Sequence, residues 1–121
     1  MRLKLVAAAT LALAACSDPA FPVAERVQAR AAGDAILAIS NRGDEAVYVR
    51  ASDPTVLALQ SACSPSTCAR VAPGEMLRLP YAEIENYDPG DAQASVAWWA
   101  FETESGGTLR ETARGSVVAD L

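Results

Sequence analysis

Residues 94–102 read A-S-V-A-W-W-A-F-E and form the most apolar of the strand-like segments in the chain. Successive side chains of a strand point to opposite faces, so Trp98 and Trp99 lie on opposite sides. Phe101 shares the side of Trp99, and Ala100 shares that of Trp98. One tryptophan can therefore belong to a core, whereas the other must lie on an outer face or under a loop.

Short apolar or alternating segments surround this stretch and are separated by turn residues. Val47 and Val49 alternate with Tyr48 and Arg50, as expected of a strand with one buried face. The sequence predicts strands near 23–31, 35–40, 46–51, 56–60, 69–71, 75–79, 94–102 and 109–118. In the last of these, Leu109, Ala113 and Val117 are expected to face one way. Ile84, in the connection over 80–91, is expected to mark a single helical turn.

This pattern of about seven or eight short strands without a long amphipathic helix predicts an all-β fold. The stretches N-R-G-D-E-A-V-Y-V (41–49) and V-A-P-G-E-M-L-R-L (71–79) resemble hairpins of bacterial immunoglobulin-like domains. The resemblance implies an immunoglobulin-like sandwich of seven or eight strands over 24–121, with a small β-barrel as the alternative. It implies no functional residues.

The N-terminus has the pattern expected of an export signal. The positive start M-R-L-K (1–4) precedes an uncharged apolar run over 5–15, too short to span a membrane as a helix. The run ends in L-A-A-C (13–16), which resembles the lipobox of bacterial lipoproteins. The resemblance implies cleavage of signal peptide 1–15 and diacylglycerol on the Cys16 thiol. The alternative is an ordinary secretory signal, with Cys16 left as a plain thiol.

A lipidated Cys16 would make the protein a membrane-anchored envelope lipoprotein, because two or more acyl chains anchor stably. Ser17 follows the cysteine and favours the outer membrane, facing the periplasm. Residues 16–23 contain two prolines and are expected to form a tether with a reach of about 20–30 Å.

Composition excludes several function classes. From Cys16 onward the chain has eight arginines against fifteen acidic residues, a formal charge of −7 that disfavours nucleic acid and anionic lipid headgroups as partners. The chain has no histidine, which excludes histidine-based catalysis and most zinc and copper sites. We therefore expect no cofactor and no metal.

Cys63 and Cys68 remain as an even pair once Cys16 is lipidated. Export places them in an oxidising compartment, where disulfides persist. We predict a structural disulfide that adds roughly 2 kcal/mol by closing a short loop. A reactive redox pair is the alternative, although such pairs are more typically C-x-x-C.

The sequence predicts a protein-binding or structural module rather than an enzyme, with an envelope protein as its partner. The candidate partner surface is Trp99 with Tyr81 and Tyr87, unless a loop such as 80–91 covers Trp99. The alternatives are a small carboxylate-dependent envelope hydrolase and an inhibitor-type lipoprotein. Four acids, which lack the pattern of a calcium-binding loop, are expected to be solvated: Glu83, Glu85, Asp88 and Asp91.

Overall fold

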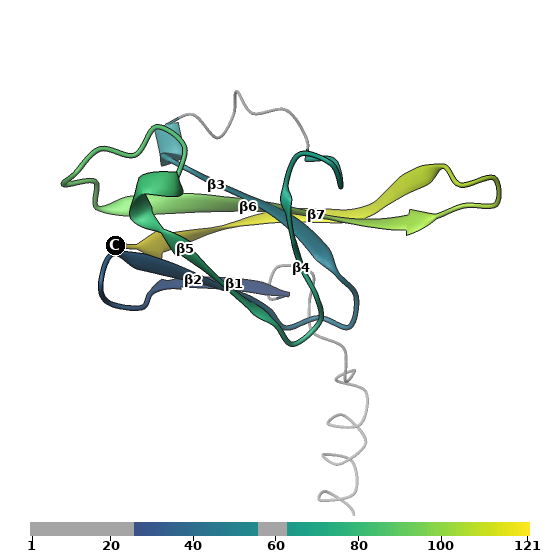
Figure 1. Cartoon of the computed structure of the whole chain (residues 1–121), viewed down its shortest axis with the longest axis horizontal. Helices are drawn as coiled ribbons and strands as arrows, with labels where there is room; N and C mark the ends of the chain where they lie inside the picture. The colour runs from purple at the N-terminus through teal and green to yellow at the C-terminus, as the bar shows by residue number, and fades with distance from the viewer. Residues whose placement is uncertain (1–25, 56–62) are drawn as a thin grey trace, which may run out of the picture.

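The structure is a computed structural model that describes residues 26–55 and 63–121 (Figure 1). The predicted signal peptide 1–15, the predicted tether over 16–23 with Cys16, and the predicted strand at 56–60 lie outside the described residues.

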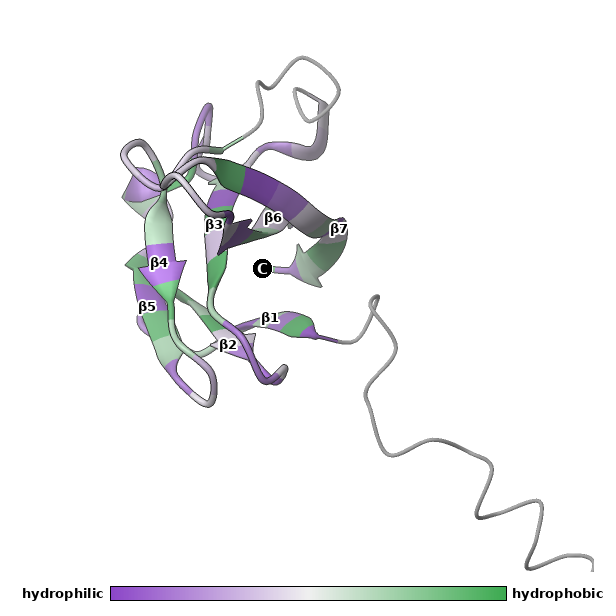
Figure 2. Ribbon diagram, turned by 90° about the vertical axis from the view of Figure 1, so that its right-hand side faces the viewer, coloured by the Kyte–Doolittle hydropathy of each residue, from purple (hydrophilic) through white to green (hydrophobic). Residues whose placement is uncertain are grey.

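Seven described strands form two antiparallel sheets that pack as a sandwich and do not close into a barrel (Figures 1 and 2). The three-stranded sheet has the order β1 (Val27–Ala31), β2 (Ile36–Asn41), β5 (Met76–Pro80). The four-stranded sheet has the order β4 (Ala69–Val71), β3 (Val47–Ser52), β6 (Gln93–Thr103), β7 (Leu109–Asp120). The predicted all-β class is confirmed.

The core lies between the sheets and is made by the inward residues of both. Trp98 is fully buried beside Leu37, Ile39 and Val96. The indole of Trp98 crosses Gly115 of β7: a Cβ at Gly115 would lie 2.8 Å from three indole atoms. Only glycine leaves the space that this tryptophan occupies.

The two predicted hairpins are wrong, because both connections cross between the sheets. The turn after β2 leads to β3 in the other sheet, and the turn at Pro73-Gly74 leads from β4 to β5. Asn41 is only 2% exposed and links the two connections between the sheets. Its Nδ2 donates to the carbonyl oxygen of Glu45, before β3, at 2.8 Å and to that of Val71, at the end of β4, at 2.9 Å. A buried amide therefore satisfies backbone groups that no hairpin ladder pairs.

The β6–β7 hairpin extends beyond the rest of the sandwich (Figure 1). Ala100 pairs with Ala113 but Phe101 pairs with Glu111, so Thr112 is an extra residue that forms a bulge. The bulge shifts the alternation by one residue. Ala113 and Val117 pack against the core as predicted, but Leu109 is 45% exposed.

The connection from β5 to β6 begins with one 3-10 turn, η3 (Tyr81–Glu83). Ile84 follows this turn and is buried in the core. The predicted helical turn near Ile84 is therefore present, one residue earlier in the chain.

Candidate binding groove

The edge of β3 is only partly covered. β4 pairs with β3 over Val47 to Val49. Closer to the end of β3, the segment at Glu85 covers the same edge, because the Glu85 N–H donates to the Ala51 carbonyl at 3.0 Å. The Asp53 N–H in turn donates to the Glu85 carbonyl at 2.9 Å. Between these two coverings, the edge of β3 opens toward β5.

A groove of about 700 Å³ lies at this opening, where β4 and β5 occupy the same side of the sandwich (Figure 2). Its floor is apolar and its rim is polar. The apolar lining residues are Ile39, Val49, Ala51, Ala69, Leu77 and Leu79, and the described rim comprises Arg50, Ser64, Thr67, Cys68, Glu83 and Glu85. An apolar concavity with a few polar groups at its mouth is typical of a binding site.

An ion pair fixes one side of the rim. Arg50 Nε and Nη2 donate to the two carboxylate oxygens of Glu85, the second at 3.1 Å. Hydrogen bonding to Arg50 lowers the pKa of Glu85, and the same bond raises the pKa of Arg50. Glu85 therefore stays ionised and supports the rim as a hydrogen-bond acceptor.

The chemistry available in the groove is limited. The carboxylates in the described lining are those of Glu83 and Glu85. A carboxyl that acts as a general acid needs a raised pKa, whereas the pKa of Glu85 is lowered. Within residues 26–55 and 63–121, no group of three or more metal-ligating side chains is placed to hold an ion. The groove is suited to binding through its apolar floor.

Trp99 lies on the outer face of the four-stranded sheet and is only 6% exposed. The predicted disulfide Cys63–Cys68 is present, with a Cα–Cα distance of 5.6 Å, and both cysteines pack on the Trp99 cluster. Ala97, Tyr48 and Phe101 complete the cluster, and the ring centroids of Tyr48 and Phe101 are 5.8 Å apart. A loop does cover Trp99, but it is the disulfide loop rather than residues 80–91.

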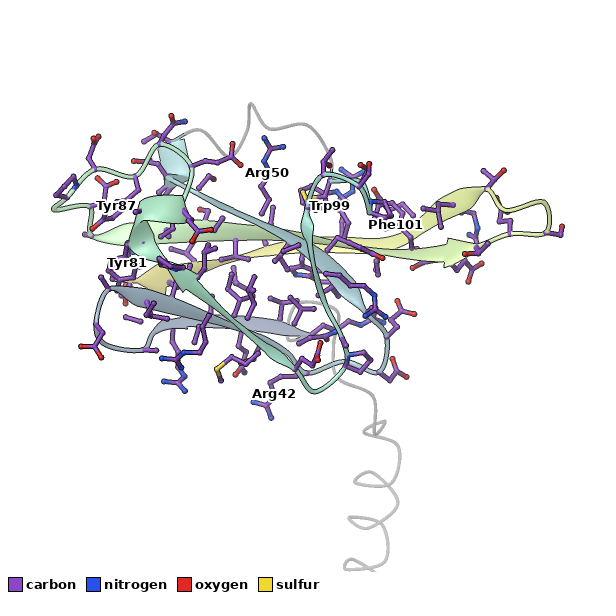
Figure 3. The ribbon with its side chains drawn as sticks, viewed as in Figure 1. Arg42, Arg50, Tyr81, Tyr87, Trp99 and Phe101 are labelled. Atoms are coloured by element: carbon purple, nitrogen blue, oxygen red, sulfur yellow. A yellow bond between two sulfur atoms is a disulfide. The ribbon has the colours of Figure 1, made fainter. Side chains whose placement is uncertain are left out.

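The structure does not bring Trp99 together with the two tyrosines. Tyr81 and Tyr87 contact each other, with ring centroids 5.5 Å apart, and pack against the main core. Figure 3 shows them at one end of the sandwich, away from Trp99 and Phe101. The three aromatic residues therefore do not form one surface.

The four acids of the 83–91 connection do not converge. Glu85 binds Arg50, while Asp91 accepts a hydrogen bond from the Asp88 N–H at 2.9 Å. Three of them are exposed and Asp91 is partly buried. This segment contributes Glu83 and Glu85 to the groove rim.

Sequence reasoning missed the groove floor. The alternation over 75–79 places Leu77 and Leu79 on the face opposite Met76 and Arg78, and the structure directs the two leucines toward the core and the groove. An inward position in the closed core and one in an open groove have the same sequence pattern. No residue signal could have separated the two.

Comparison with protein-family models, with curated protein sequences and with solved structures gives no match for this chain. The class established by the structure is an all-β, two-sheet sandwich with one local disulfide. No helix in the described residues is both long and apolar enough to cross a bilayer.

Proposed function

We propose that this protein is a lipid-anchored envelope lipoprotein whose sandwich domain binds another envelope protein through the groove. The observation that carries the proposal is the apolar floor between β4 and β5. Each of these strands lies at an edge of its sheet. An extended segment of a partner could add to the β5 edge and place alternate side chains on Leu77 and Leu79.

The immunoglobulin-like class is proposed for the fold. The division into three and four antiparallel strands, with connections that cross between the sheets, supports it. The cysteines depart from the antibody pattern, because Cys63–Cys68 closes a local loop rather than joining the two sheets. The buried Trp98 also lies on β6 instead of the third strand.

The proposed anchor and location depend on the lipobox. L-A-A-C (13–16) would place diacylglycerol on Cys16, and Ser17 favours the outer membrane facing the periplasm. The short tether would hold the groove close to the membrane, where envelope partners are also confined.

We favour binding over hydrolysis because most of the described groove floor is apolar and one of the two carboxylates in the described lining, Glu85, is held by Arg50. Arg50 keeps Glu85 ionised, so Glu85 cannot serve as the protonated acid that a carboxylate hydrolase needs. An inhibitor that blocks a hydrolase would be a special case of the binding class and would use the same groove.

The test is crosslinking of the lipidated protein in its own envelope, followed by mass spectrometry. Glu83→Arg changes the groove rim, and Asp44→Arg makes the same charge change at an exposed turn outside the described groove lining. A saturable partner that is lost with Glu83→Arg and kept with Asp44→Arg is expected. Equal capture by both variants would contradict the groove, and no capture above background would favour a small-molecule ligand.

A further inference from the structure

The outer face of the three-stranded sheet carries positive charge on an otherwise acidic domain. Alternation in β1, β2 and β5 directs one set of side chains away from the core. This set includes the apolar pair Ile36 and Pro80 at one end, and we call its remaining members the arginine face: Gln28, Arg30, Ala38, Ser40, Met76 and Arg78. None of the three strands contains an aspartate or glutamate.

Arg30 and Arg78 flank Ala38 in the same row of the sheet. At about 4.8 Å between neighbouring strands, their backbones lie roughly 10 Å apart. In the described part of the chain, neither guanidinium has a carboxylate within 4.0 Å, the limit for a salt bridge. Four other arginines are each paired with a glutamate: Arg26, Arg50, Arg110 and Arg114.

A shallow depression of about 400 Å³ lies beside this row, lined by Gln28, Ser40, Arg42 and Met76, among others. Arg42 Nη1 donates to Gln28 Oε1 at 3.2 Å, and Figure 3 shows Arg42 pointing away from the sandwich. Glu75 is the one carboxylate among the described lining residues. Its Oε1 accepts the N–H of Ala72 at 3.0 Å, which holds the carboxylate toward the turn. The described lining of the depression therefore combines one arginine with neutral polar side chains.

We propose that the arginine face docks on anionic, phosphate-bearing headgroups of the membrane that holds the anchor. The proposal rests on the proposed lipidation of Cys16. The net charge of the domain predicts repulsion from such a surface, but the charge is unevenly distributed: acids gather at 83–91 and on the β6–β7 hairpin. A sheet face with dispersed cations matches a plane of headgroups better than it matches a single acidic peptide.

The position of the anchor supports this orientation. β1 belongs to the same sheet and begins at Val27, eleven residues after Cys16, a reach of at most about 40 Å. A tether of that length holds the face at high effective concentration beside the bilayer. Each arginine near an anionic surface then contributes roughly a fivefold factor in affinity, enough to orient a domain that is already anchored.

Met76 is a native reporter of this docking. It is the only methionine after residue 1, it is 45% exposed, and it lies on the arginine face. The lipidated protein is reconstituted in phosphatidylcholine vesicles with or without phosphatidylglycerol. Oxidation of Met76 by chloramine-T is then followed by mass spectrometry. Docking should slow oxidation about fivefold on the anionic vesicles only, and high salt should restore the rate.

The double variant Arg30→Gln/Arg78→Gln should abolish the protection. Arg110→Gln/Arg114→Gln makes the same charge change on the hairpin and should leave the protection intact. Equal oxidation on both vesicle types would overturn the docking, as would protection that survives in the first double variant. Failure of the protein to sediment with neutral vesicles would instead overturn the lipid anchor, and the docking with it.

Discussion

Gly115→Ala should destabilise the sandwich, because the added Cβ would clash with the indole of Trp98. The added Cβ would lie 2.8 Å from Cε2, Cζ2 and Nε1 of Trp98, whereas non-bonded carbon atoms prefer about 3.5–4.0 Å. Trp98 is fully buried and cannot move aside without disturbing the core. Overpacking of this kind costs about 1–3 kcal/mol. Replacing glycine by alanine within a strand also stabilises the folded state by about 0.5–1 kcal/mol, because the unfolded chain loses less conformational entropy on folding.

The expected net loss is therefore about 1–2 kcal/mol in the free energy of unfolding, or roughly 5–15 °C in Tm for a domain of this size. Urea unfolding followed by tryptophan fluorescence measures it. Ser116→Ala, at the exposed neighbouring position, is the control and should change stability by less than about 0.5 kcal/mol.

A double-mutant cycle tests the cause. Trp98→Phe removes the indole atoms that the new Cβ would meet, and Trp99 remains as the fluorophore. In that background, Gly115→Ala should be neutral or slightly stabilising, which gives a coupling energy of about 1–3 kcal/mol. An equal loss in both backgrounds, or no loss in the wild type, would refute the steric explanation.

Three further outcomes are expected. Cys16→Ser should release the protein from membranes, and a variant that still fractionates fully with them would exclude lipid anchoring. Cys63 and Cys68 should resist thiol labelling in the unreduced native protein, and replacing both by alanine should lower the free energy of unfolding by roughly 2 kcal/mol in urea titrations. The pKa of Glu85 is lowered by its bond to Arg50, so their mutual stabilisation is present above the ordinary glutamate pKa and is lost as pH falls through the lowered value. Because both side chains are partly exposed, Glu85→Gln should cost less than about 1 kcal/mol at neutral pH; a difference that persists unchanged at strongly acidic pH would contradict this assignment.

Local patterns predicted most of the strands and the disulfide. Val47 and Val49 are buried as their alternation with polar neighbours indicated, because a two-residue period is a property of the strand itself. The opposite placement of Trp98 and Trp99 follows from the same geometry. The C-x4-C spacing was sufficient for the disulfide because a separation of only five positions already holds the two thiols close together.

The candidate site was predicted less well, because exposure depends on what packs on top of a side chain. Trp99 lies on the outer face and under a loop, as its position in the strand allowed, but the covering loop is the disulfide loop and not residues 80–91. The alternation over 75–79 separates Leu77 and Leu79 from Met76 and Arg78, but it does not indicate that the two leucines line an open groove. Tyr81 and Tyr87 pack on the core instead of joining Trp99.

What the sequence by itself determined is therefore local: which segments extend, which side chains face inward, and which cysteines pair. Only the tertiary structure decided that β2 and β3 belong to different sheets, because strands of either sheet show the same alternation. It also decided where the arginines lie: Arg30 and Arg78 are 48 positions apart in sequence, and the pairing of β1 and β5 with β2 brings them to one face. Pairing partners depend on contacts between distant segments, and no local pattern encodes them.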